Sequence, residues 1–323
     1  MTNSTHKTAL VTGANSGLGF EAAAQLAEQG YSKVILLCRN LEKANEAQKS
    51  LQQKTGKDVF EPLAADMSAL SSVKIATKKL SQLGVHIDLL LLNAGVWPGA
   101  QISRNNEGIE TAFASTLLGH HCLTLGLLNH NLLSPEAKII ISSSELARGD
   151  FPGAKLLDIK QFSQQHFNGD LTKAILATTH VTSPYQYDSN NHYSLVKLFV
   201  SWWAQALSRR LPKGITVQSV SPGISIGTNA KRHQPKRLRL IMSFLLPLLG
   251  KSAPVHIAAK RYLDAAQMGS EENGHFFASR PGKFVGKMQR QSTPHLFFKE
   301  HQEACWQALG LLTPGLTLKN NVI

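Results

Sequence analysis

Three glycines follow one another closely near the start of the chain, in a loop between two segments of different periodicity. Residues 8–11 are typical of a strand, and residues 17–29 have the alanine-rich spacing of a helix. The connecting segment reads Thr12-Gly13-Ala14-Asn15-Ser16-Gly17-Leu18-Gly19, a GxxxGxG spacing. A pyrophosphate can approach the backbone N–H groups of a helix N-terminus only where no Cβ blocks it. In this strand–loop–helix context the spacing predicts dinucleotide binding, and the alternative is a glycine-rich turn without a ligand.

Apolar runs keep alternating with helix-period stretches along the rest of the chain. Further strands are predicted at residues 34–38, 59–65, 87–92, 139–141, 215–220 and, as a short last one, 276–278. Helices are predicted at residues 41–54, 70–83 and 193–211. Most of the strand runs are almost continuously apolar, as in strands buried on both faces. The pattern predicts an α/β fold with a single Rossmann-type doubly wound parallel sheet of about seven strands and helices on both faces.

No linker rich in Pro, Gly and Ser divides the chain, so residues 1–323 are predicted to form one domain. Two segments depart from the alternation. Residues 150–191 are polar and irregular and are interpreted as an insertion, and residues 228–254 are basic and then apolar and are interpreted as an appended helical flap. Ligands of open parallel sheets bind at the carboxyl ends of the strands.

Composition narrows the possible partners. The formal net charge of +13 favours attraction of anionic cofactors, and no zinc-finger, KH or RNP pattern accompanies it, so nucleic acid is not expected. The three cysteines, Cys38, Cys122 and Cys305, form no CxxC pair, which argues against a disulfide scaffold or a metal site. The N-terminal residues lack the apolar core of a secretory signal, and the longest apolar stretch, residues 238–249, is too short to span a bilayer. A cytoplasmic location is therefore expected.

The second predicted strand ends in Leu37-Cys38-Arg39-Asn40, without an acidic residue. A carboxylate there would bind an adenosine ribose, whereas a guanidinium suits a 2′-phosphate. Arg39 therefore favours NADP(H), and the alternative is a solvated surface arginine. Asp66, after the third strand, either accepts a hydrogen bond from an adenine amino group or caps a helix that begins near Ser68.

Among five tyrosines only Tyr193 has a lysine four residues later, at Lys197. On a helix this spacing puts both side chains on one face. A nearby ammonium lowers the pKa of a phenol, and a phenol tuned in this way can exchange a proton with a carbonyl or an alcohol. The pair predicts general acid–base chemistry centred on Tyr193.

At this point the chain resembles the short-chain dehydrogenase/reductase family and, within it, the branch of retinol dehydrogenases and protochlorophyllide reductases. The matching segments occur in the family's order and cover most of the chain up to about residue 230. They are TGANSGLG, LLCRN, the Asp66-Met67 pair, LNAG at residues 92–95, IISSS at 140–144, YSLVK at 193–197 and SPGISIGT at 221–228.

The resemblance implies roles for individual residues. Asn93, Ala94 and Gly95 pack under the adenosine side of the cofactor, Lys197 also binds the nicotinamide ribose, and Pro222, Gly223 and Thr228 border the nicotinamide. The full implied cofactor site consists of Gly13, Asn15, Ser16, Gly17, Leu18, Gly19, Arg39, Asp66, Met67, Asn93, Ala94, Gly95, Tyr193, Lys197, Pro222, Gly223 and Thr228.

A serine at the end of the fifth strand holds the substrate oxygen in the family, and three compete for that position here. Strand alternation separates Ser143 from Ser142 and Ser144, and the register of the motif favours Ser144. The implied catalytic residues are thus Ser144, Tyr193 and Lys197. One departure concerns Thr116, which takes the place of an asparagine that holds a water in the proton relay of relatives. We expect this substitution to weaken the relay.

Residues 231–239 are strongly basic and residues 240–246 are apolar, where relatives place a substrate-binding flap. An apolar helix there would line a lipophilic pocket, and its basic residues could add weak contact with an anionic membrane surface. The alternative is a solvated basic stretch. Together these features predict an NADP(H)-dependent oxidoreductase that transfers a hydride between nicotinamide and a carbonyl or alcohol of a small lipophilic substrate. The alternative function is a dinucleotide-binding protein with weak or no turnover, acting as a sensor or an interaction partner.

Overall fold

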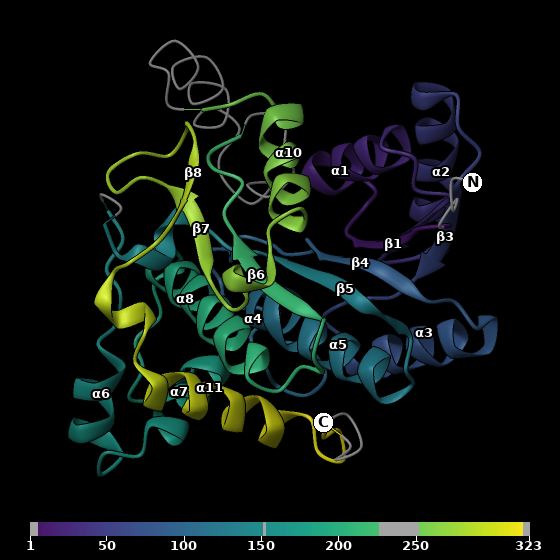
Figure 1. Cartoon of the computed structure of the whole chain (residues 1–323). Coiled ribbons are helices and arrows are strands. Elements are labelled where there is room, and N and C mark those ends of the chain that lie inside the picture. The colour runs from purple at the N-terminus through teal and green to yellow at the C-terminus, as the bar shows by residue number, and fades with distance from the viewer. Residues whose placement is uncertain (1–5, 151–152, 226–251, 319–323) are drawn as a thin grey trace.

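The sheet expected from the alternating pattern is present, with eight strands. The computed structural model describes residues 6–150, 153–225 and 252–318. Within them the strand order is β3-β2-β1-β4-β5-β6-β7-β8 (Figure 1). The strands are β1 (Thr8–Thr12), β2 (Lys33–Cys38), β3 (Phe60–Ala64), β4 (Ile87–Leu92), β5 (Leu133–Ser142), β6 (Thr216–Val220), β7 (Phe276–Ser279) and β8 (Met288–Arg290). The order reverses between β1 and β4, and a crevice at the carboxyl ends of the strands follows from such a reversal.

The first seven strands are parallel, and β8 pairs antiparallel with β7 through Phe277, Ala278 and Ser279. This eighth strand was not predicted. It has only three residues, of which Gln289 and Arg290 are exposed, so it carries neither an apolar run nor an alternation.

Helices cover both faces of the sheet (Figure 1). One face packs against α1 (Gly17–Glu28), α2 (Leu41–Thr55) and α10 (Val255–Ala266). The other face packs against α3 (Leu70–Leu83), α5 (Gly119–Asn129) and α8 (Ser189–Ser208). The helix leading into α5 consists of α4 (Thr111–Phe113) and a π-helical turn, η1 (Ala114–Leu118). On this side α11 (Lys299–Leu312) packs outside α8.

The segment interpreted as an irregular insertion contains two helices, so that interpretation was wrong in part. They are α6 (Ile159–His166) and α7 (Leu171–His180). Asp158 accepts a hydrogen bond from the N–H of Gln161 and Asp170 from that of Lys173, both at 2.9 Å, which caps each helix. Both helices are short, with eight and ten residues, so each has too few turns for a helical period to stand out in the sequence.

Two boundaries differ from the predicted ones in ways that affect the site. Strand β5 begins six residues before the predicted run, at Leu133, because Leu133 pairs with Ile87 of β4; after an irregularity the pairing resumes at Lys138. Helix α8 begins at Ser189, since the Asp188 carboxylate accepts hydrogen bonds from the N–H groups of Asn190 and Asn191 at 3.1 and 2.9 Å. Tyr193 therefore lies one turn inside the helix.

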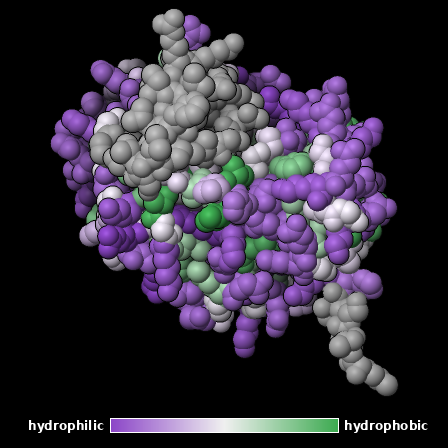
Figure 2. Space-filling view, turned by 90° about the horizontal axis from the view of Figure 1, so that it is seen from above, coloured by the Kyte–Doolittle hydropathy of each residue, from purple (hydrophilic) through white to green (hydrophobic). Residues whose placement is uncertain are grey.

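One helical run, Thr111–Asn129, is long and apolar enough to cross a membrane, but 89% of it is buried inside the protein. Its environment is that of a core helix on one face of the sheet, in contact with α3 and α8. The face shown in Figure 2 is mostly hydrophilic, with hydrophobic side chains in small groups near its middle. Short 3-10 turns complete the described secondary structure: η2 (Glu145–Arg148), η4 (Ser270–Glu272) and η5 (Pro294–Leu296).

Gly119 lies where this core helix passes closest to the loop after β3. A Cβ added there would be 2.0 Å from the carbonyl oxygen of Met67, which is backbone and cannot move aside cheaply. We expect Gly119→Ala to lower the free energy of unfolding by about 2 kcal/mol or more through overpacking. The matched control is Gly310→Ala in α11, where a Cβ would meet nothing within 4 Å. It should stabilise by about 0.5–1 kcal/mol through helix propensity. Urea unfolding midpoints that shift equally in both variants would contradict this.

Candidate active site

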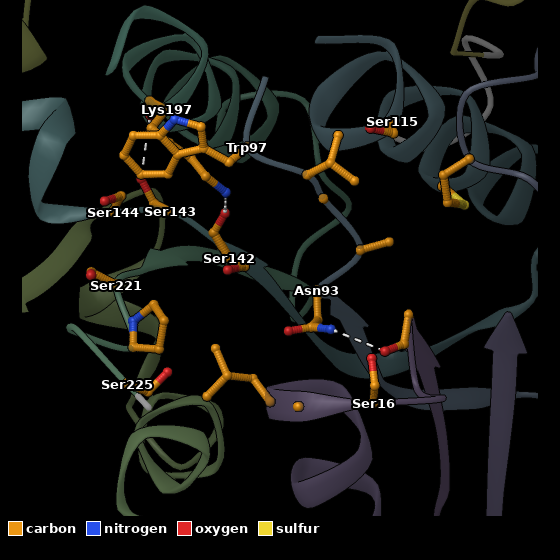
Figure 3. A pocket seen from close by; sticks show the side chains of 18 of the residues that line it. Ser16, Asn93, Trp97, Ser115, Ser142, Ser143, Ser144, Lys197, Ser221 and Ser225 are labelled. Atoms are coloured by element: carbon orange, nitrogen blue, oxygen red, sulfur yellow. Dashed lines mark hydrogen bonds between the residues drawn. The ribbon is translucent and has the colours of Figure 1, made fainter. Parts of the chain in front are cut away.

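The carboxyl ends of β1 to β6 surround a cavity of about 470 Å³ (Figure 3). Ser16 and Asn93 lie at one end of it and Trp97, Ser144 and Lys197 at the other. The structure thus brings nearly all the predicted site residues it describes to one place. They are Gly13, Asn15, Ser16, Gly17, Leu18, Arg39, Asp66, Met67, Asn93, Ala94, Gly95, Ser144, Tyr193, Lys197, Pro222 and Gly223. Thr228 and residues 228–251 of the predicted flap lie outside the described residues.

The glycine loop has a geometry that favours glycine. Gly13 and Gly17 have φ values of +67° and +58°, in the left-handed region. Gly19 does not line the cavity. It packs behind the loop, where a Cβ would be 2.4 Å from the carbonyl oxygen of Gly13 and 2.5 Å from Nδ2 of Asn93. Helix α1 begins directly after Ser16, whose side chain makes no capping bond, so its first N–H groups point toward the cavity without a side-chain partner. This cradle fits a dinucleotide pyrophosphate.

The Thr12 hydroxyl joins the glycine loop to the loop after β4. Its oxygen accepts hydrogen bonds from the N–H groups of Asn93 and Ala94 at 2.8 and 2.9 Å, and Asn93 Nδ2 donates to the Thr12 carbonyl at 3.0 Å. Behind it, His120 Nδ1 donates to the carbonyl of Thr116, so Nε2 accepts from the Thr12 hydroxyl, both at 2.9 Å. Burial lowers the pKa of His120 to about 3, which keeps this ring neutral. Both ring nitrogens of His120 are thus bonded within the protein, and the residue supports the loop.

The end of the cavity beside β2, where the sequence predicts the adenosine, carries two cations. Arg39 is half-exposed, and its Nε lies 3.6 Å from Oδ2 of Asp66. The other oxygen of Asp66 accepts hydrogen bonds from the N–H and hydroxyl of Ser68 at 2.9 and 2.7 Å, so this carboxylate does cap the turn before α3. Lys43 also lines the cavity and was missed by sequence reasoning. The signal for it was its position four residues after Arg39, in the first turn of α2.

Lys197 and Tyr193 lie together at the opposite end. Lys197 Nζ donates to the carbonyl of Ser142 at 2.7 Å (Figure 3). It lies 5.6 Å from the centroid of the Tyr193 ring. The side chain is almost fully buried, and burial lowers the pKa of Lys197 to about 7. The expectation that Lys197 lowers the pKa of Tyr193 was wrong for this structure. Burial and the charge of Glu145 raise the pKa of Tyr193, because the phenolate would lose its hydration beside a carboxylate.

The three serines have different partners. The hydroxyl of Ser142 bonds to that of Tyr262 at 2.8 Å, and the Ser143 hydroxyl donates to the carbonyl of Lys197 at 3.3 Å. Ser144 is partly exposed, and within the described part of the chain its hydroxyl oxygen accepts from the N–H of Leu146 at 3.3 Å and donates to no partner, so its own hydrogen can point to a ligand. These contacts favour Ser144, although the alternation argument does not apply to it, since β5 ends at Ser142.

A buried ionic network under the loop after β6 was not predicted. Glu145 accepts a hydrogen bond from the Ser221 hydroxyl, and one of its oxygens lies 3.4 Å from Nη1 of Arg261. Arg261 also donates to the carbonyls of Ser221 and Gly286 at 3.0 and 2.7 Å. Both charged side chains are nearly fully buried. Because partners from distant parts of the chain surround it, Glu145 gave no signal in the sequence.

A second buried pair holds the start of α8. His192 Nε2 lies 3.0 Å from Oε2 of Glu110, and the side chains are 1% and 3% exposed. The Glu110 carboxylate also accepts from the N–H groups of Ala112 and Phe113 at 2.9 and 2.8 Å. Glu110 thus links the residue before Tyr193 to the start of α4, which leads into the π-helical turn.

Thr116 lies in the π-helical turn, buried behind Gly95. Its hydroxyl oxygen has no hydrogen-bond partner among the described residues, and a Cβ on Gly95 would lie 3.0 Å from it. The carbonyl of Thr116 is taken by His120. A role for this residue in proton transfer remains a prediction.

Comparison with known proteins bears directly on the family. A model described as short chain dehydrogenase matches residues 7–156. The chain is 30% identical over 246 residues to the short-chain dehydrogenase TIC 32 B, chloroplastic, of Brassica napus, which covers 75% of this chain and 71% of that protein. It is 28% identical over 318 residues to retinol dehydrogenase 13 of Homo sapiens, covering 96% and 86%.

A further relative, the WW domain-containing oxidoreductase of Drosophila melanogaster, is 33% identical over 231 residues. The match covers 70% of this chain and 51% of that protein, so the chain spans about half the length of this relative.

Among solved structures, a short chain dehydrogenase from Burkholderia cenocepacia in complex with NADP shares the fold with a TM-score of 0.58 and 18% identity. That match covers 84% of this chain and 95% of the other. The glycine loop and the Tyr193–Lys197 pair agree with the similarity to the TIC 32 B protein, which is 30% identical and matched over 71% of its length. The chain therefore belongs to the short-chain dehydrogenase family.

Proposed function

We propose that this protein is an NADP(H)-dependent oxidoreductase that interconverts a carbonyl and an alcohol on a small lipophilic substrate. The observation that carries the proposal is that Tyr193, Lys197 and Ser144 share one cavity with the glycine loop. A cofactor lying along the loop would reach the tyrosine at the opposite end of the cavity.

The cations at the adenosine end support NADP(H) in particular. Arg39 and Lys43 both line the cavity after β2, where a 2′-phosphate would lie. One oxygen of Asp66 accepts two hydrogen bonds from Ser68, and the other lies near Nε of Arg39. Because this contact involves Nε, the other edge of the guanidinium remains available to a phosphate. The related fold from Burkholderia cenocepacia was solved with NADP, which agrees with this choice.

Tyr193 would supply the proton. Because its pKa is raised, its phenol is protonated at neutral pH and can donate to a carbonyl oxygen as a hydride reaches the carbonyl carbon from the reduced nicotinamide. The Ser144 hydroxyl would donate a second hydrogen bond to the same oxygen and hold it in place. Lys197 would place positive charge beside the developing phenolate.

The far end of the cavity is apolar enough for a lipophilic substrate. Val96, Trp97, Leu146 and Ile224 line the cavity, and Trp97 stacks on the tyrosine. A substrate flap at residues 228–254 and weak contact with an anionic membrane remain predictions. Turnover distinguishes this proposal from the alternative of a dinucleotide-binding protein with weak or no catalysis.

Arg39→Asp should abolish or invert a preference for NADPH over NADH. A charge-assisted hydrogen bond contributes roughly 1.5–3 kcal/mol, or on the order of 10–100-fold in affinity. The matched control is Lys49→Asp, the same change of charge at an exposed position of α2 outside the cavity. Dissociation constants for both dinucleotides measure the effect. Equal affinity of the unmodified protein for NADPH and NADH would refute the assignment.

Tyr193→Phe should fold and bind NADPH normally but lose roughly 10²–10⁴-fold in the rate of carbonyl reduction, because the proton donor is removed. The control is Tyr31→Phe, a tyrosine outside the cavity. Single-turnover NADPH oxidation with a lipophilic aldehyde measures the rate. Unchanged turnover in Tyr193→Phe would exclude this residue as the acid.

Lys197→Met should remove activity and weaken NADPH binding while making the protein more stable near pH 6. The pKa of Lys197 falls from 10.5 to about 7, so the cost of burying its charge is complete below pH 7 and fades as the pH rises toward 10.5. We expect the free energy of unfolding of Lys197→Met to exceed that of the unmodified protein by an amount on the order of 2 kcal/mol at pH 6, and this difference should narrow by pH 10. The measurement is urea unfolding at several pH values, with exposed Lys78→Met as the control. A stability difference independent of pH would contradict it.

A further inference from the structure

The indole of Trp97 lies flat on the ring of Tyr193. The ring centroids are 4.0 Å apart with an interplanar angle of 23°, and both side chains line the cavity (Figure 3 shows Trp97 above Ser143 and Ser144). Trp97 stands two residues after the Asn93-Ala94-Gly95 motif, at a position that the sequence did not single out.

The segment that carries Trp97 is attached on both sides. Before it, the Thr12 hydroxyl accepts from the N–H groups of Asn93 and Ala94. After it, the Tyr187 hydroxyl donates to the carbonyl of Gly99 at 2.7 Å. Pro98, next to the tryptophan, is buried. The indole is therefore a fixed wall of the cavity and not a loosely held surface side chain.

The stack restricts what can approach the phenol. The oxygen of Tyr193 leaves its ring in the ring plane, and Trp97 lies one ring thickness to the side of that plane. A carbonyl that accepts the Tyr193 proton has two substituents on its carbon. With an indole beside the phenol, one of them comes into contact with Trp97.

We propose that Trp97 is a specificity-determining residue that favours aryl carbonyls, in which an aromatic ring is bonded directly to the reacting carbonyl carbon. This rests on the proposed function, since it deepens the assignment of the substrate. A flat ring offset against an indole gains attraction beyond its buried area, which corresponds to roughly two- to tenfold in affinity, whereas a puckered saturated ring contacts the indole through fewer atoms. The reaction itself is unchanged: the hydride goes from the nicotinamide to the carbonyl carbon and the proton from Tyr193 to the oxygen.

The test compares benzaldehyde with cyclohexanecarbaldehyde, which have the same number of carbons and differ in the flatness of the ring. Two ratios of benzaldehyde to cyclohexanecarbaldehyde are measured for each protein. The first is the ratio of their kcat/KM values for reduction by NADPH. The second is the ratio of their affinities in the presence of NADP⁺, where no reduction occurs. Differences in intrinsic reactivity cancel when one variant is compared with another. The variants are Trp97→Leu, which removes the aromatic face, and Trp97→Phe, which restores one. Ile102→Ala, an exposed position nearby in the same loop and outside the cavity, is the control.

In the unmodified protein the aryl aldehyde should bind and react preferentially. Trp97→Leu should reduce both ratios by roughly two- to tenfold, Trp97→Phe should restore most of the loss, and Ile102→Ala should leave both unchanged. Ratios that are the same in Trp97→Leu and the unmodified protein would overturn the inference. If no aldehyde is reduced but the binding ratios follow this pattern, the proposed function fails and the role of Trp97 stands.

Discussion

The Thr12 hydroxyl connects the two loops between which the sheet reverses its strand order. It accepts hydrogen bonds from the backbone of Asn93 and Ala94 after β4, while its own chain continues into the glycine loop after β1. Strands on either side of such a reversal lead their helices to opposite faces, so their loops would otherwise separate. The cavity, the placement of the cofactor cradle and the anchoring of Trp97 all depend on this junction.

Around that junction the protein accepts buried charge that a core designed for stability alone would avoid. Lys197 is buried with its pKa lowered, Glu145 is paired with Arg261, and Glu110 is paired with His192. A buried ion pair adds little net stability compared with apolar residues of the same volume, because desolvation offsets the attraction. Each of these groups instead contacts a segment of the site: Glu110 and His192 the start of α8, Glu145 and Arg261 the loop after β6, and Lys197 the end of β5.

The raised pKa of Tyr193 and the lowered pKa of Lys197 have one physical origin. Both groups are removed from water, which disfavours the charged form of each. A neutral phenol beside a lysine that gains its proton only near neutral pH suits proton donation to a carbonyl. Ionising the phenol, as alcohol oxidation requires, is opposed by the same burial and by Glu145.

The sequence by itself determined the features that depend on local pattern. The strand–helix alternation gives the parallel sheet, the glycine spacing gives the phosphate cradle, and the four-residue interval gives the Tyr193–Lys197 face, because each needs only neighbours along the chain. Only the tertiary structure decided what surrounds those residues. The stack of Trp97 on Tyr193, the Glu145–Arg261 pair 116 residues apart and the burial of Lys197 arise where distant segments meet. The direction of a pKa shift is also decided by the tertiary structure, because desolvation depends on everything packed around a group. The residues next to that group in the sequence do not predict it.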